Sequence, residues 1–230
     1  MIRGVVFDKD GTLFDFNATW GAWSRQMLEQ ESGGDTALLD RLSDTLGYDL
    51  ATDRFRPGSI VIAETVEVVA AAIQRVTGEA DRTALIARMN AAARAVPQVE
   101  ATPLRPFTAA LRARGLRLGV ATNDAEDPAR RHLTNAGIAQ DFEMIAGYDS
   151  GNGGKPAPGQ LLAFCALTGL AASDCLMVGD SLHDLHAGRA AGMRCVGVLT
   201  GPAPAGELGP HAEAVLPSIA DLPDWIDRHG

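Results

Sequence analysis

Two acidic residues follow a short apolar run near the start of the chain. Residues 2–7 are rich in branched and aromatic side chains, and Asp8 and Asp10 come directly after them. This run predicts a strand buried on both faces, and the following glycine and threonine predict a turn. Because side chains alternate along an extended chain, Asp8 and Asp10 are expected on one side and Lys9 on the other. Two crowded carboxylates indicate a metal site or an acid/base pair, although a solvated acidic turn gives the same pattern.

Three further polar clusters each come after a predicted strand in the second half of the chain. They are Thr122-Asn123, Lys155-Pro156 and Gly179-Asp180-Ser181-Leu182-His183-Asp184. The carboxyl ends of parallel strands share one edge of a sheet, so these clusters are expected beside Asp8 and Asp10. Acids suit Mg²⁺, a lysine and a hydroxyl suit phosphate oxygens, and a carboxylate can act as nucleophile. Together the clusters predict a phosphoryl-transfer site.

The elements that position these clusters fall into two regions. Between residues 16 and 97, apolar residues recur at helical spacing in four stripes, bounded by glycine, aspartate and proline. No strand is expected there, so the pattern predicts an inserted all-helical module of about eighty residues, far longer than an ordinary loop. Residues 98–106 hold prolines and predict a stiff return linker.

Beyond this linker the pattern alternates between strand and helix, which predicts an α/β fold with a parallel sheet. The predicted strands cover residues 116–121, 144–146, 175–178, 195–199 and, more weakly, 214–216.

Composition limits the functional classes. The chain has 230 residues, of which 46% are hydrophobic and 21% charged, as in globular proteins with a substantial core. A formal net charge of −9 argues against nucleic acid or an anionic membrane as partner. Three cysteines without C-x-x-C spacing and no apparent leader predict a soluble, cytoplasmic protein with reduced thiols. Both a monomer and a homodimer are compatible with the sequence.

The four polar motifs, in this order and each after a predicted strand, resemble those of the haloacid dehalogenase superfamily of hydrolases. The resemblance covers nearly the whole chain and is strongest to the phosphoglycolate-phosphatase-like branch with a helical C1-type cap. It implies a Rossmann-like catalytic core formed by residues 1–15 and 98–230. Residues 16–97 would form the helical cap, in agreement with the predicted insertion.

The resemblance also implies catalytic roles. Asp8 would be the nucleophile that forms an aspartyl phosphate, and Asp10 would be general acid for the leaving alkoxide and then base for water. Mg²⁺ would be held by Asp8, Asp180 and the backbone carbonyl of Asp10. Asp184 would support either the metal or Lys155. A helix N-terminus also favours an acid at position 184, so the metal role of Asp184 has a structural alternative.

The same resemblance also implies which residues would bind the phosphate group of the substrate. Gly11, Thr122, Asn123 and Lys155 would surround its oxygens, although threonine and asparagine are also common at strand ends. Lys9 departs from the family pattern, which usually has an apolar residue there. Its expected orientation away from the site would leave the mechanism intact, but a buried lysine would need a partner.

These observations predict a Mg²⁺-dependent phosphatase for a small organic phosphate monoester, phosphoglycolate-like or a sugar phosphate. A phosphomutase similar to beta-phosphoglucomutase is the nearest alternative. A dehalogenase is less favoured, because that chemistry needs neither a metal nor a second acid. A non-enzymatic receiver-like phosphoacceptor is also less favoured, because it lacks a helical insertion and carries its acceptor further along the chain.

One segment of the insertion suggests a specificity element. Arg54 and Arg56 flank Phe55 and precede a proline and a glycine that favour a turn. Two arginines beside an aromatic can recognise a carboxylate or a second phosphate. The alternative interpretation, which has at least equal weight, is that both are solvated loop residues.

Overall fold

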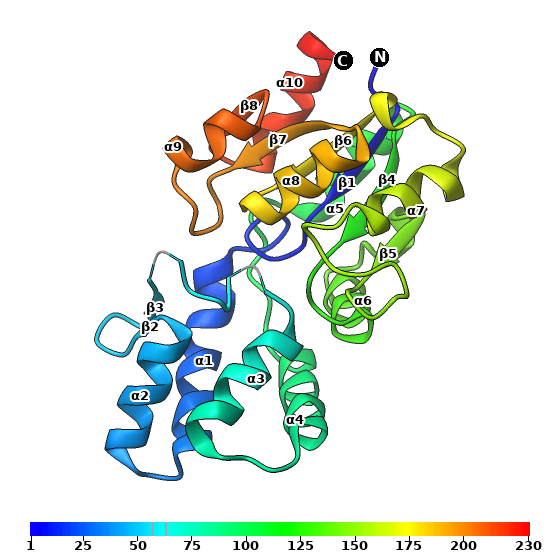
Figure 1. The fold of residues 1–230 in the computed structure, drawn as a ribbon. Coiled ribbons are helices and arrows are strands. Elements are labelled where there is room, and N and C mark those ends of the chain that lie inside the picture. The colour runs from blue at the N-terminus through cyan, green and yellow to red at the C-terminus, as the bar shows by residue number, and fades with distance from the viewer. Residues whose placement is uncertain (57, 63) are drawn as a thin grey trace.

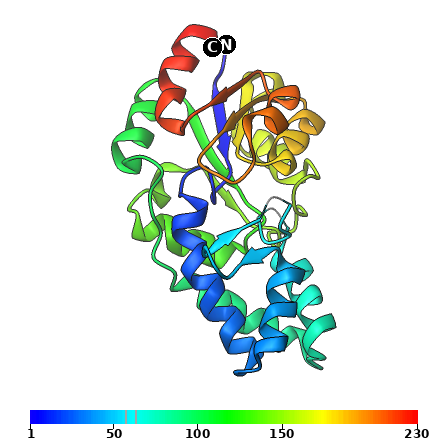
Figure 2. The ribbon, with the colours of Figure 1, turned by 90° about the vertical axis from the view of Figure 1, so that its left-hand side faces the viewer.

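A twisted parallel sheet covered by helices lies above a separate group of helices (Figure 1). The computed structural model describes residues 1–56, 58–62 and 64–230. Within these residues, no helix combines the length and the apolar character needed to cross a bilayer. The carboxyl end of the first strand points toward the helical group (Figure 2), so the polar motifs lie where the two parts meet.

The sheet has six parallel strands in the order β5-β4-β1-β6-β7-β8, which confirms the predicted α/β class. The strands are β1 (Gly4–Phe7), β4 (Arg117–Ala121), β5 (Met144–Ala146), β6 (Cys175–Gly179), β7 (Arg194–Val198) and β8 (Ala214–Leu216). All four residues of β1 are buried, and β1 pairs on both sides, with β4 and with β6. Asp8 therefore leaves the sheet near its centre.

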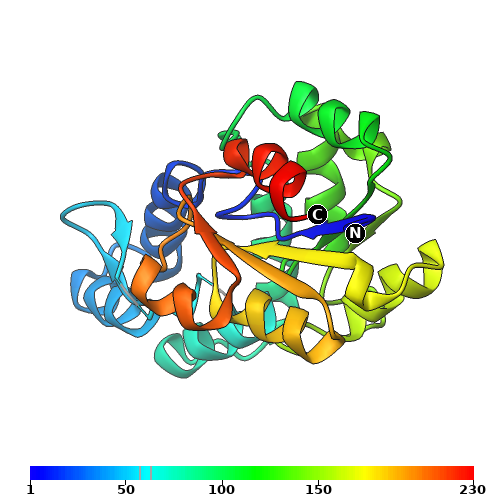
Figure 3. The same ribbon diagram turned by 90° about the horizontal axis from the view of Figure 1, so that it is seen from above.

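Helices pack on both faces of the sheet (Figure 3). One face is covered by α5 (Leu104–Ala113), α6 (Glu126–Asn135) and α10 (Leu222–His229), and the other by α7 (Gly159–Thr168) and α8 (Leu182–Ala191). A short α9 (Ala205–Leu208) lies near β8 in the chain. Strand alternation divides β1 between the two cores: Val5 and Phe7 join the first cluster and Val6 the second.

The return linker is shorter than predicted. Helix α5 begins at Leu104, so Pro106 lies in the first turn of a helix and not in the linker. Proline is tolerated in a first turn because its missing N–H has no intrahelical partner there.

The inserted region contains four helices with a core of their own. They are α1 (Phe16–Ser32), α2 (Thr36–Leu46), α3 (Val66–Thr77) and α4 (Arg82–Arg94). Aspartate side chains cap α1, α2 and α4, and Gly33, Gly47 and Gly78 end the first three helices in the left-handed conformation. The aspartates and glycines that bound the apolar stripes in the sequence thus mark the ends of these helices.

The prediction that the insertion is all-helical is wrong. A two-stranded antiparallel sheet joins β2 (Tyr48–Asp49) to β3 (Arg54–Phe55). The rings of Tyr48 and Phe55 lie 5.3 Å apart in edge-on contact. The Tyr48 hydroxyl donates to the Gly21 carbonyl in α1 over 2.8 Å. These contacts stabilise the two strands. Strands of two residues are too short to show an alternation of apolar and polar side chains, so the sequence did not predict them.

A leucine pair tests the core of the insertion. Leu28→Ala should lower the free energy of unfolding by about 2–5 kcal/mol, because Leu28 is fully buried and truncation leaves a cavity. The matched control Leu167→Ala, at a helical position that is 60% exposed, should change it by less than about 0.5 kcal/mol. Urea denaturation measures both, and equal losses would contradict the assigned core.

Candidate active site

Most of the predicted site residues meet in one cavity between the sheet edge and the inserted helices. The cavity has a volume of about 110 Å³. Its lining includes the predicted residues Asp8, Asp10, Thr122, Asn123, Lys155 and Asp184. They follow four different strands, and Asp184 lies in the first turn of the helix after its strand, so only the parallel sheet brings them together.

Lys155 is the buried cation of this site. Its Nζ lies 2.6 Å from Asp8 Oδ1 and 2.5 Å from Asp184 Oδ1. Burial by itself would lower the pKa of Lys155, but the carboxylates of Asp184 and Asp8 more than offset this and raise it. Burial raises the pKa of Asp8 to about 7, with Asp184 and Asp10 adding to the rise and Lys155 opposing it. The lysine therefore stays charged and holds the Asp8 carboxylate in place.

The loop that carries Lys155 is fixed by the neighbouring motif. Asn123 Nδ2 donates to the Lys155 carbonyl at 2.9 Å, and Asn123 Oδ1 accepts from the Lys155 N–H at 2.8 Å. The Lys155–Pro156 peptide bond is cis. The Thr122 hydroxyl oxygen accepts from the Asp124 N–H at 3.1 Å, which leaves its own hydrogen able to donate to a phosphate oxygen. Asn123 thus positions Lys155, a role that the sequence did not reveal.

Asp184 is held from both sides. Its Oδ2 accepts from the Ser181 N–H at 3.0 Å and from the Ser181 hydroxyl at 2.7 Å, while Oδ1 pairs with Lys155. Ser181 and Asp184 form a capping box at the start of α8. The serine–aspartate spacing predicts a capping box from the sequence. Only the fold shows that the capping aspartate also orients the side chain of Lys155.

Asp8, Asp180 and Asp184 form a buried cluster in which one carboxylate oxygen from each lies within 4.8 Å of the others. Asp180 Oδ1 accepts from Thr12 Oγ1 at 3.3 Å, whereas Asp180 Oδ2 is buried without a hydrogen-bond partner among the described residues. Burial, followed by repulsion from Asp8 and Asp184, raises the pKa of Asp180 well above its ordinary value. Three acids beside one lysine fit a divalent cation with oxygen ligands, such as Mg²⁺. The Asp10 carboxylate is not part of this cluster.

Gly11 makes room for the cluster. Its φ is +83°, and a Cβ at this position would collide with the Asp180 carboxylate. Gly11 is therefore required by the turn and by the close approach of Asp180. Contact with a phosphate group stays a prediction for this residue.

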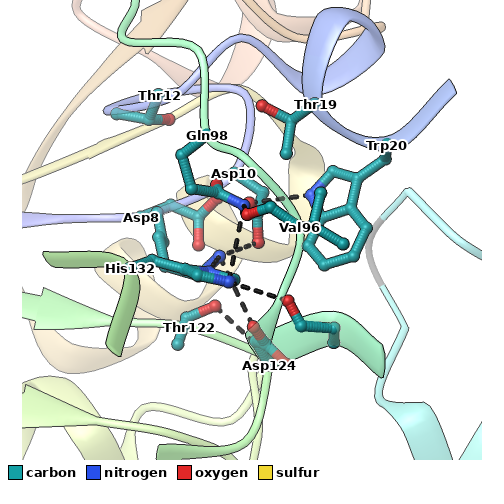
Figure 4. Close-up of polar contacts among 12 residues, drawn as sticks. Asp8, Asp10, Thr12, Thr19, Trp20, Val96, Gln98, Thr122, Asp124 and His132 are labelled. Carbon is teal, nitrogen blue, oxygen red and sulfur yellow. Dashed lines mark hydrogen bonds and ion pairs between the residues drawn. The ribbon is translucent and has the colours of Figure 1, made fainter. Parts of the chain in front are cut away.

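The expected orientation of Lys9 is wrong. Its side chain is fully buried, and Nζ lies 2.6 Å from Asp10 Oδ2, 3.2 Å from His132 Nδ1 and 3.4 Å from Asp124 Oδ2. Figure 4 shows these three partners, Asp10, His132 and Asp124, close together. The alternation fails because β1 ends at Phe7 and the chain bends at Lys9. Trp20 Nε1 donates to the other Asp10 oxygen at 2.8 Å. Both oxygens of the Asp10 carboxylate are thus held by side chains that the motif pattern does not include.

His132 links Lys9 to the inserted helices. Its Nδ1 accepts from Lys9, which places the hydrogen on Nε2, where it donates to the Ala93 carbonyl of α4 at 2.9 Å. Burial and then the Lys9 charge lower the pKa of His132 to about 4, so the ring is neutral near pH 7. Burial raises the pKa of Asp124 to about 6, with Lys9 opposing the rise.

The predicted specificity arginines lie elsewhere. Arg54 is exposed on β3, and Arg56 pairs with Asp44 at 2.9 Å; neither belongs to the described lining of the cavity. The hairpin directs this segment along α2, which a loop prediction did not anticipate. The cavity wall comes instead from α1, α3, α4 and residues 61–64, as far as these are described. Most of these wall residues belong to the apolar stripes that predict the inserted helices, and a stripe gives no sign of which of its members face a ligand.

Comparisons with known proteins agree with the fold and the motifs. The haloacid dehalogenase-like hydrolase family matches residues 2–192, and the chain belongs to this family. A phosphoglycolate phosphatase of Rhodospirillum rubrum is 31% identical over 257 aligned positions, covering 98% of this chain and 91% of that protein. The predicted enzyme class, a phosphoric monoester hydrolase, is thereby confirmed.

Solved structures show the same fold. A predicted phosphoglycolate phosphatase of Haemophilus somnus superimposes with a TM-score of 0.71 at 20% identity, covering 98% of both chains. Beta-phosphoglucomutase of Clostridium difficile superimposes with a TM-score of 0.68 at 18% identity, covering 99% of this chain and 96% of that one.

Removing the buried cation beside Asp10 should be costly. Lys9→Met should lower the free energy of unfolding by about 3–5 kcal/mol, because it leaves the partly buried carboxylates of Asp10 and Asp124 without their cation. The double variant Lys9→Met/Asp124→Asn should recover at least about 1 kcal/mol of this loss, since one of the stranded charges is gone. Urea denaturation at pH 7 measures both variants. A Lys9→Met protein as stable as the wild type would refute the network.

His132 should make stability depend on pH. An unfolded histidine titrates near 6.5 and His132 near 4, so the unfolded state binds more protons in this window and stability falls as the pH falls through it. His132→Phe should make the loss between pH 6.5 and 4.5 smaller by about 1–3 kcal/mol.

Urea midpoints at several pH values give these slopes, and comparing slopes removes the constant cost of the lost hydrogen bonds. Leu167→Ala, an exposed change that removes no titrating group, serves as the control and should keep the wild-type slope. A His132→Phe slope equal to that of the wild type would show that the histidine is not held neutral.

Proposed function

We propose that this haloacid dehalogenase-like hydrolase is a Mg²⁺-dependent phosphatase for small organic phosphate monoesters, working through a phosphorylated Asp8. The proposal rests mainly on Lys155, which bridges Asp8 and Asp184. Beside them, one carboxylate oxygen of Asp180 has no hydrogen-bond partner among the residues that the structure describes. We further propose that residues 1–15 and 98–230 form the catalytic core and residues 16–97 a cap. The acidic chain and the small cavity between the sheet edge and the inserted helices favour a small-molecule substrate.

The proposed reaction has two displacements. In the first, an Asp8 carboxylate oxygen attacks phosphorus, the bond to the ester oxygen breaks, and Asp10 gives a proton to the departing alkoxide. In the second, water attacks phosphorus, the bond to Asp8 breaks, and Asp10 takes the proton from water. Lys155 and the Thr122 hydroxyl would hold the phosphate oxygens, and Trp20 and Lys9 would fix the direction of the Asp10 carboxylate.

The carboxylates of Asp8, Asp180 and Asp184 would hold the Mg²⁺ ion. When bound, the ion would supply the positive charge that lets a carboxylate approach a phosphate dianion. Asp184 already binds Lys155 and Ser181, so its contribution would combine support of the lysine with closure of the metal site.

A phosphate balance separates this proposal from its alternatives. A hydrolase releases one inorganic phosphate for each ester consumed, whereas a mutase returns the phosphoryl group to a sugar. A receiver-like acceptor would be phosphorylated by acetyl phosphate without repeated turnover. Malachite-green detection of phosphate, with ³¹P NMR of the organic products, distinguishes the three.

Substitution of the two motif acids tests the roles. Asp8→Asn should lower kcat by about 10³-fold or more, because an amide is a poor nucleophile. Asp10→Asn should lower kcat by about 10²–10⁴-fold for alkyl esters and clearly less for 4-nitrophenyl phosphate, whose alcohol leaves without a proton. Asp40→Asn, an exposed change in α2, is the matched control. Near-normal turnover by Asp8→Asn would end the proposal.

Metal dependence gives a further test. Chelation should abolish activity, Mg²⁺ should restore it, and Ca²⁺ should inhibit. Ca²⁺ accepts more ligands in a looser geometry and would displace the nucleophile from its line of attack. Initial rates after dialysis against a chelator, with each ion added back, measure this. Full activity in the chelated protein would remove the metal from the mechanism.

A further inference from the structure

The cap-side wall of the cavity is apolar. Ten described residues of the inserted region contribute carbon-rich side chains to the lining: Phe16, Trp20, Trp23, Met27, Val61, Ile62, Val66, Val69, Met89 and Ala93. Trp20 and Trp23 meet edge-on with ring centroids 5.1 Å apart, so the wall includes a continuous aromatic surface. Among the described lining residues of this region, Glu64 and Asn90 add polar side chains, and the Trp20 N–H is already bound to Asp10. The organic part of a substrate held at Asp8 would face this wall.

Positive charge is scarce on the same wall. Among the described lining residues Lys155 is the one lysine, none is an arginine, and Lys155 is already bound by two carboxylates. The imidazole of His183, which is also part of the lining, faces Glu64, with 3.6 Å between Nε2 and Oε1. Residues 57 and 63, which the structure does not describe, are proline and alanine and carry no charge. A second anionic group on the substrate would find no free cation here.

We infer that the alcohol part of the substrate is uncharged and largely apolar, a short alkyl or aryl alcohol, and not a carboxylate-bearing or doubly phosphorylated one. This inference rests on the proposed phosphatase function and adds the substrate class. Enclosing a carboxylate among aromatic and aliphatic side chains without a partner is strongly unfavourable, whereas an alkyl group gains from the same enclosure. The amide of Asn90, which also interacts with the Tyr148 side chain, carries donor and acceptor atoms that can bind a hydroxyl on the alcohol.

A pair of esters that differ in charge but not in size tests the inference. Isobutyl phosphate and 2-phosphoglycolate have the same arrangement of heavy atoms, two methyl groups in one replacing two carboxylate oxygens in the other. With Mg²⁺, kcat/KM should be at least about tenfold higher for isobutyl phosphate, since an unpaired buried charge weakens binding throughout the reaction. Intrinsic reactivity works against this result, because the carboxylate makes glycolate the better leaving group.

A variant that adds a positive charge to the wall gives a second test. Asn90→Arg places a guanidinium on the half-buried face of α4 that lines the cavity. The ratio of kcat/KM for 2-phosphoglycolate to that for isobutyl phosphate should rise by about tenfold or more. The matched control Asn135→Arg, exposed at the end of α6, should leave the ratio within about twofold of the wild type. Each ester serves as its own reference, so a general loss of stability does not imitate the effect.

The outcomes separate the inference from the proposed function. Hydrolysis of 4-nitrophenyl phosphate together with a preference for 2-phosphoglycolate, or equal use of both esters, would overturn the inference and leave the phosphatase proposal standing. Failure to hydrolyse any of the three esters with Mg²⁺ would overturn the phosphatase proposal itself. An unchanged ratio in Asn90→Arg, with a native circular dichroism spectrum, would also count against the wall as the selecting surface.

Discussion

The buried ammonium group of Lys155 is the interaction on which the site depends. Three carboxylates lie around it away from water, and burial raises the pKa of Asp8 to about 7 despite the lysine. Such a concentration of acids is stable only if cations are held among them. Several contacts therefore hold Lys155 in place. Asn123 binds its backbone N–H and carbonyl, and Asp184 binds its side chain. Asp184 is in turn held by the capping box at the start of α8.

A second buried lysine extends the same principle toward the inserted helices. Lys9 balances Asp10 and Asp124 and donates to a neutral His132, whose other nitrogen reaches the backbone of α4. Trp20 of α1 completes the set at the opposite oxygen of Asp10. The proposed general acid is thus oriented by groups from both parts of the molecule. A displacement of α1 relative to the sheet would act on the Asp10 carboxylate through Trp20, and a displacement of α4 would act on it through His132 and Lys9.

The two sides of the cavity have different chemical roles. The sheet edge provides charge, hydrogen-bond donors and a nucleophile, all suited to a phosphate group of any ester. The inserted helices provide mainly aromatic and aliphatic surface, which discriminates by shape and by the cost of burying charge. Because the wall uses residues that also belong to a helical core, such as Val69 and Met89, its chemistry is constrained by packing as well as by the substrate.

The sequence by itself determined the sheet elements, the helical stripes and the order of the four motifs, because these depend on local periodicity and on residues adjacent in the chain. β5 and β8 have the predicted bounds, and Asp35, one of the aspartates that bound the predicted stripes, caps α2. The small hairpin of Tyr48 and Phe55 was missed because two-residue strands carry no period.

Only the tertiary structure decided which side chains meet across long separations. The bend after β1 turned Lys9 toward Asp10, and packing of α6 against the inserted helices brought His132 to the same lysine, 123 positions away in the chain. The hairpin carried Arg54 and Arg56 away from the cavity, while ordinary core residues became its wall. Local patterns record which residues are buried and at what period. They do not record what each buried residue faces, because that is set by how distant elements pack.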